Sequence, residues 1–114
     1  MVTLADREFE TPSDDQTPLT GTNLDSLYAE LDQDVWSIVD EHHLEGVYEF
    51  EDFRTALDFT VEVGELAEDL WHHPDIHLAW GEVRIELFTH SIDGLYENDF
   101  VVAARMDRLY TGFA

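Results

Sequence analysis

The sequence predicts an α+β fold in the order α-β-β-α-β-β-α, with a four-stranded antiparallel sheet whose helices pack on one face. Three stretches carry apolar residues three and four positions apart, which is the period of an amphipathic helix. Two pairs of short stretches rich in Val, Ile and aromatic residues flank the middle helix, and a glycine lies between the members of each pair. Hairpins that alternate with helices favour an antiparallel sheet covered by those helices.

Residues 1–22 are polar and acidic and contain no apolar period. Two Thr-Pro pairs, at Thr11 and Thr17, interrupt regular structure in this stretch. We therefore expect an acidic, flexible tail over 1–22, followed by a single domain over 23–114.

The first helix and the first hairpin are expected between residues 23 and 50. Asn23 is expected to cap a short helix. The apolar side chains of this helix recur at helical spacing: Leu24, Leu27, Tyr28 and Leu31. Strands are predicted at 35–39 and 47–50, with Gly46 at the bend between them.

A longer helix begins at about Asp52, where the apolar period changes to that of a helix. Its apolar face carries Phe53, Ala56, Leu57, Thr60, Val63, Ala67 and Leu70. Pro74 disfavours the helical conformation at the residue before it, so the helix should end at about Trp71 or His72.

The second hairpin and the last helix complete the predicted fold. Strands are expected at 77–80 and 83–89. Alternation along the second strand places three aliphatic residues on one face: Val83, Ile85 and Leu87. His90 then belongs to the opposite face. After a turn at Gly94, an amphipathic helix is expected over about 100–110.

The chain is strongly acidic, with 27 Asp and Glu residues against 5 arginines and a net charge of −22. Because the acidic residues are spread through every segment, we interpret them as the solvated surface of a halophilic protein. A cation-binding or nucleic-acid-mimicking surface is the alternative. Direct binding to nucleic acid is not expected, because this charge repels the phosphate backbone.

Self-repulsion on this scale predicts that the fold loosens in dilute buffer. Molar salt shortens the screening length to ~3 Å and removes most of the repulsion. The melting temperature should therefore rise between dilute buffer and molar KCl. A melting temperature that stays constant would contradict the halophilic interpretation.

The chain contains no cysteine, which excludes thiol catalysis and thiolate metal sites. Nothing in the sequence therefore requires an oxidising compartment. It has no apolar run approaching ~20 residues and no basic, apolar leader, so we expect no membrane span and no secretory signal. These features predict a cytoplasmic protein.

Imidazoles and carboxylates gather around the end of the long helix and the strands after it: Glu68, His72, His73, His90 and Asp99. Histidine titrates near neutrality, so such a cluster can donate and accept protons at cellular pH. Glu68 lies four residues before His72, where its carboxylate can hold the second nitrogen of that imidazole. The neighbouring aromatic residues can stack on a flat heteroaromatic ligand: Trp71, Trp80 and Phe88.

The same residues also have a purely structural interpretation. Adjacent histidines are often polar surface residues, and we interpret His42-His43 in this way, because no proline, helix end or preceding i−4 acid accompanies them. The aromatic residues can equally belong to the core or to an interface. The residue types alone therefore support a functional site and a structural cluster equally.

The spacing of the cluster distinguishes between these interpretations. Glu68-x3-His72-His73-Pro74, followed by Trp80, His90 and Asp99 at fixed gaps, resembles the signature of the pterin-4a-carbinolamine dehydratase family. The stretches 53–59 and 83–90 also resemble that family. The resemblance extends over roughly residues 24–110, and the predicted order of elements agrees with the family's fold.

The resemblance implies a lyase that dehydrates a 4a-hydroxytetrahydropterin to the quinonoid dihydropterin, as in tetrahydropterin recycling. N5 loses a proton and the 4a-hydroxyl leaves as water, so an acid and a base suffice and no cofactor is implied. The implied catalytic residues are His72 and His90, with Glu68 tuning His72. The implied substrate-binding residues are Trp71, His73, Pro74, Phe88, Thr89 and Asp99.

One position departs from the family's pattern. The family usually has a threonine where this chain has Tyr96, so we expect the threonine-dependent capping box of the last helix to be lost. Asp99 can still stabilise the start of that helix through the helix dipole.

Two other functions stay open. A metal site would use His72, His73, His77 and His90, but adjacent histidines do not readily ligate one ion tetrahedrally, and no H-E-x-x-H spacing is present. The other is a non-catalytic oligomerising or regulatory protein of the same fold, since members of the resembled family act as dimerisation partners of a transcription factor in animals. We expect a homodimer or homotetramer.

Overall fold

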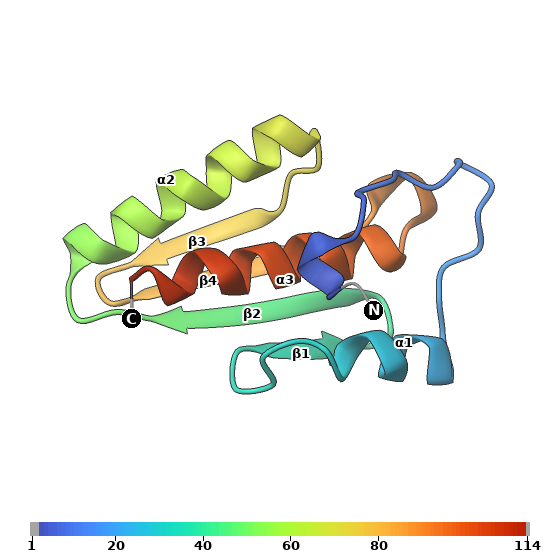
Figure 1. Ribbon diagram of the computed structural model, residues 1–114, viewed down its shortest axis with the longest axis horizontal. Helices are drawn as coiled ribbons and strands as arrows, with labels where there is room; N and C mark the ends of the chain where they lie inside the picture. The colour runs from blue at the N-terminus through green and yellow to red at the C-terminus, as the bar shows by residue number, and fades with distance from the viewer. Residues whose placement is uncertain (1–2, 114) are drawn as a thin grey trace.

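The structure, a computed structural model, describes residues 3–113. Three α-helices and four strands follow the order α-β-β-α-β-β-α (Figure 1), which confirms the predicted α+β class. The helices are α1 (Gly21–Tyr28), α2 (Phe53–Leu70) and α3 (Glu97–Thr111). The strands are β1 (Trp36–Val39), β2 (His43–Glu49), β3 (Asp75–Ala79) and β4 (Glu82–Leu87). Two short 3-10 helices are also present, η1 (Leu4–Asp6) and η2 (His90–Ile92).

The sheet is antiparallel throughout, with the strand order β1-β2-β4-β3. Helices α2 and α3 lie over one face of it (Figure 1). That face carries the aliphatic residues predicted for β4, because Val83, Ile85 and Leu87 are all fully buried. The predicted alternation in this strand is therefore confirmed. The residues that follow β4 lie near the end of α2 and the start of α3.

The prediction that Gly46 forms the bend of the first hairpin is wrong. Gly46 lies within β2 and pairs with Trp36 of β1. The turn is formed instead by Asp40 and Glu41, both with a φ of 55°. Gly46 is needed for space, because a Cβ at this position would lie 2.7 Å from the Trp36 ring.

The prediction that Asn23 caps the first helix is also wrong. Helix α1 begins at Gly21 and its N-cap is Thr20, so Asn23 lies in the first turn. Leu24 nevertheless faces the core as expected, with 1% of its surface exposed. Helical spacing thus identified the buried side chain but not the residue that starts the helix.

Replacing Gly46 by alanine is expected to lower the free energy of unfolding by about 1–3 kcal/mol, because the buried Trp36 ring must move. Gly64→Ala is the matched control. A Cβ at Gly64 meets nothing within 4 Å, and alanine favours a helix interior by ~1 kcal/mol over glycine. Urea denaturation should therefore show opposite effects for the two variants. Equal effects would contradict this account of Gly46.

Asp107 fastens α3 to the first hairpin. Its Oδ1 accepts hydrogen bonds from Trp36 Nε1 at 2.8 Å and from the Tyr48 hydroxyl at 2.6 Å. Burial raises the pKa of the Asp107 carboxyl above its usual value. The largest buried side chains of β1 and β2 are thereby held against the last helix.

Residues 3–22, which the sequence places in an acidic tail, make contacts with the rest of the chain. Leu4 in η1 is 2% exposed, and Leu19 N–H donates to the Leu95 carbonyl at 2.8 Å. The tail boundary at residue 22 stays a prediction. In the described part of the chain, no helix is long and apolar enough to cross a membrane.

Candidate active site

A cavity of about 250 Å³ lies where the end of α2 meets the end of β4. The residues that line it are Thr11, Trp71, His72, His73, Thr89, His90 and Ser91. The structure therefore brings the three predicted imidazoles together, although they come from two separate parts of the chain. Thr11 and Ser91 were not predicted. Ser91 follows a predicted residue directly, whereas nothing in the sequence indicated Thr11.

The end of α2 determines how the first two imidazoles point. Trp71 takes the left-handed conformation, with a φ of 52°, and ends the helix. His72 N–H then donates to the Ala67 carbonyl at 3.0 Å and Trp71 N–H to the Glu68 carbonyl at 3.3 Å, which is the Schellman pattern. The reversal leaves Trp71 77% exposed and turns His72 inward, where it is 8% exposed.

His72 is held by Asp99 rather than by Glu68. The His72 Nε2 atom lies 2.7 Å from Asp99 Oδ1, and Asp99 is fully buried. The prediction that Glu68 tunes His72 is therefore wrong. It assumed that the helix continues to residue 72, whereas the left-handed residue Trp71 turns the chain before His72.

Glu68 contacts the next imidazole instead. Its Oε2 atom lies 2.5 Å from His73 Nε2, and both side chains are about half exposed or more. The Trp71 ring packs edge-on against the same imidazole, with centroids 4.9 Å apart. Two residues predicted for the site thus orient His73, and Pro74 follows it without lining the cavity.

Asp99 also connects the site to the start of α3. Its Oδ2 atom accepts hydrogen bonds from the Thr89 hydroxyl at 2.8 Å and from Tyr96 N–H at 3.0 Å. The part of the capping box that Asp99 supplies is therefore retained despite the tyrosine. A single buried carboxylate joins the end of β4, the start of α3 and the His72 imidazole.

These contacts determine which imidazole nitrogens carry hydrogen. A carboxylate only accepts, so Nε2 of His72 and Nε2 of His73 each donate to one. In the neutral form of each ring, Nδ1 is then an acceptor available to a bound molecule. Among the described residues, no side chain hydrogen-bonds the ring of His90. Both of its nitrogens are thus available for hydrogen bonds within the part of the chain that the structure describes.

Phe88 supports His90 but does not line the cavity. The centroids of the Phe88 and His90 rings are 4.1 Å apart. Phe88 also packs against His42, with ring centroids 4.6 Å apart. His42 Nε2 in turn lies 2.8 Å from Asp93 Oδ1. The interpretation of His42-His43 as simple hairpin surface is therefore incomplete, because the turn between β1 and β2 reaches the segment that carries His90.

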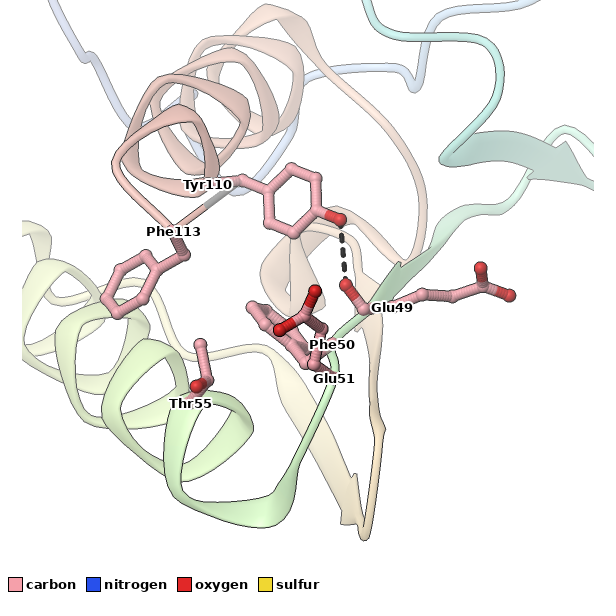
Figure 2. Close-up of a pocket in the computed structure, with 6 residues that line it drawn as sticks. All are labelled: Glu49, Phe50, Glu51, Thr55, Tyr110 and Phe113. Carbon is pink, nitrogen blue, oxygen red and sulfur yellow. Dashed lines mark hydrogen bonds between the residues drawn. The ribbon is translucent and has the colours of Figure 1, made fainter.

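A second cavity is larger, at about 630 Å³, and lies where the end of α3 meets the start of α2 (Figure 2). Its lining consists of Glu49, Phe50, Glu51, Thr55, Tyr110 and Phe113, without an imidazole. The Tyr110 hydroxyl donates a hydrogen bond to the Glu49 carbonyl at 2.8 Å. The larger cavity therefore lacks the predicted proton-transfer groups.

The other residues considered from the sequence lie elsewhere. Trp80 is 68% exposed at the turn between β3 and β4, outside the lining of the smaller cavity. His77 lies on β3 and does not join the other imidazoles there. Within residues 3–113, no group of three or more His, Cys, Asp or Glu side chains is placed to hold a metal ion.

Comparison with known proteins identifies the family. Residues 17–109 match the family model described as pterin 4 alpha carbinolamine dehydratase. The chain belongs to this family. The family resemblance is thereby confirmed, and the matched residues include the whole sheet, α1, α2 and all but the last two residues of α3.

Individual relatives agree. A protein of Rubrobacter xylanophilus, named as a candidate pterin-4-alpha-carbinolamine dehydratase, is 50% identical over 109 residues, covering 96% of this chain and 100% of its own. One from Alkaliphilus metalliredigens with the same name is 45% identical, covering 80% and 81% of the two chains.

Solved structures show the same fold. The crystal structure of a transcriptional coactivator/pterin dehydratase from Brucella melitensis has a TM-score of 0.75 at 32% identity, covering 82% of this chain and 98% of that one. A pterin dehydratase-like protein identified as a RuBisCO assembly factor in the alpha-carboxysome has a TM-score of 0.58 at 23% identity, covering 66% of this chain and 88% of that one. The second likeness concerns the fold alone.

Proposed function

We propose that the chain is a pterin-4a-carbinolamine dehydratase, a lyase that removes water from a 4a-hydroxytetrahydropterin, and that the reaction takes place among His72, His73 and His90. Family membership and 50% identity over nearly the whole chain support the activity. The meeting of three imidazoles at one cavity, two of them fixed by carboxylates, supports the location.

The geometry supports a division of roles. Dehydration requires removal of the N5 proton and protonation of the 4a-hydroxyl as the C4a–O bond breaks, so that water leaves. His72 is suited to the base, because Asp99 fixes its Nε2–H and leaves Nδ1 as a lone-pair nitrogen. His90 is suited to the acid, because no side chain among the described residues restrains its nitrogens.

The neighbouring residues are suited to hold the pterin. His73 is fixed by Glu68 and lines the cavity, where its Nδ1 can accept a hydrogen bond from the ligand. Trp71 lines the same cavity with most of its surface exposed, so its face is available for stacking on the flat heterocycle. Asp99 acts by fixing His72 and also accepts a hydrogen bond from Thr89, which itself lines the cavity.

A non-catalytic oligomerising protein is the alternative. Such a role would require no fixed imidazole tautomers, so the paired carboxylates support the enzyme. The homodimer or homotetramer stays a prediction, as do the halophilic adaptation and the cytoplasmic location. Among the described residues, three exposed large apolar side chains outside the cavity provide surface for an oligomer: Phe53, Val61 and Trp80.

Stopped-flow measurement with chemically generated 4a-hydroxytetrahydropterin, in molar KCl, tests the proposed function. The protein should accelerate formation of the quinonoid dihydropterin well beyond the spontaneous rate. A parallel sample treated with EDTA should react equally fast, since the proposed steps need only protons. A rate equal to the spontaneous one would contradict the dehydratase. Activity lost on chelation and restored by zinc would support the metal site instead.

A further inference from the structure

The N-terminal segment, defined here as residues 3–16, lies outside the residues that match the family model, which begin at residue 17. It nevertheless reaches the smaller cavity. Thr11 is one of the lining residues, and the Phe9 ring lies against the His72 ring, with centroids 5.6 Å apart and planes tilted by 50°. The residues that match the family model therefore do not account for this side of the site.

Helix α3 holds the start of this segment (Figure 1). Arg105 donates from Nε to the Ala5 carbonyl at 3.1 Å and from Nη2 to the Arg7 carbonyl at 2.8 Å. Leu4 is buried beside them in the core. One guanidinium thus satisfies two backbone carbonyls immediately before Phe9.

Two further arginines hold the same segment. Arg108 Nη1 donates to Asp6 Oδ1 at 2.7 Å, and this pairing lowers the pKa of the Asp6 carboxyl to about 2. Arg7 donates to Glu30 at 3.3 Å and to Glu97 at 3.5 Å. Three of the 5 basic residues of a chain with a net charge of −22 therefore bond within or to this segment.

The contacts of the three arginines differ in how strongly they fix the N-terminal segment. Ion pairs between exposed side chains typically contribute little to stability, so Arg108 and Arg7 alone would leave an ordinary surface attachment. Arg105 is half-buried and its partners are backbone carbonyls, which fixes the path of the chain rather than one side chain. The attachment therefore determines where Phe9 lies.

We propose that the N-terminal segment forms a wall of the pterin site and that Phe9 is a positioning residue for His72. The Asp99 hydrogen bond fixes Nε2 of the imidazole but still permits the ring to turn about that bond. The Phe9 ring packs against the imidazole and sets its plane. This inference rests on the proposed function of His72 and adds a residue to it.

A double-mutant cycle tests this role. Phe9→Ala should lower kcat/KM by roughly 3- to 10-fold, as expected for loss of one aromatic contact that orients the base. In a His72→Ala background the same substitution should have no further effect. Phe113→Ala is the matched control, because this half-buried phenylalanine lies at the larger cavity, and it should leave the rate unchanged. Equal losses from Phe9→Ala in both backgrounds would overturn the proposal.

A second pair of variants tests the attachment without relying on turnover. Arg105→Ala should shift the ring-proton NMR signals of His72 in the same direction as Phe9→Ala, because both variants remove the Phe9 ring from the His72 imidazole. Arg84→Ala removes a guanidinium from the exposed β4 face and should leave these signals in place. Unchanged His72 signals in both Phe9→Ala and Arg105→Ala would overturn the proposal, even if the protein proved to have no dehydratase activity.

Discussion

His90→Ala is expected to lower kcat for the dehydration by about 10²- to 10⁴-fold, the usual contribution of a positioned proton-transfer group. His72→Ala should cause a loss of the same order. His90 is exposed and no described side chain hydrogen-bonds its ring, so its removal leaves no unsatisfied partner. The loss in the His90 variant should therefore occur in a protein with an unchanged melting temperature.

His77→Ala provides the matched control for both substitutions. It removes an exposed imidazole of β3 that does not line the smaller cavity, so turnover should remain that of the unmodified protein. Stopped-flow rates and circular dichroism melts measured on the same preparations separate loss of chemistry from loss of fold. Near-normal turnover in both His72→Ala and His90→Ala would refute the assignment of the acid–base pair.

Asp99→Ala is expected to destabilise the fold and to reduce activity together. The substitution removes the acceptor of three hydrogen bonds, from Thr89, Tyr96 and His72. Unpaired buried donors cost about 1–3 kcal/mol each, so the free energy of unfolding should fall by about 3 kcal/mol even if water satisfies some of them. The rate should fall because His72 loses the contact that fixes its tautomer.

Two other substitutions make this prediction specific. Asp99→Asn retains the shape and one acceptor oxygen, which can serve Thr89 and Tyr96, while its NH2 group faces His72 Nε2, so it should lose less stability than Asp99→Ala. Glu68→Ala removes a carboxylate that is largely exposed, at 67% for its side chain, and should not change the unfolding midpoint in urea. If Asp99→Ala were as stable as Glu68→Ala, Asp99 would not be the structural centre of the site.

Local patterns predicted most of the fold. Alternation in 83–87 and the proline at position 74 gave the buried face of β4 and the end of α2 within one or two residues. These features depend on neighbours in the sequence and on the period of each element. Gly46 was misplaced because its role is to leave space for Trp36 on the adjacent strand, and the sequence alone does not indicate that partner.

The sequence predicted that three imidazoles lie together, but not which carboxylate contacts each of them. Fixed spacing identified the three imidazoles, whereas the i,i+4 rule assigned Glu68 to His72. The left-handed residue Trp71 breaks the helical geometry on which that rule depends, so Glu68 contacts His73 and the buried Asp99 contacts His72. Phe9 and Thr11 could not be predicted, because they reach the site through long-range contacts with α3.

The central claim is that a pterin binds among His72, His73 and His90. Titrating protein labelled with ¹⁵N-histidine with biopterin, a stable oxidised pterin, tests this most directly in NMR spectra recorded in molar KCl. We predict that the imidazole signals of His72, His73 and His90 shift on binding while that of His77 does not. Binding that leaves all three signals unchanged, or that shifts only residues of the larger cavity around Phe50 and Tyr110, would contradict the account.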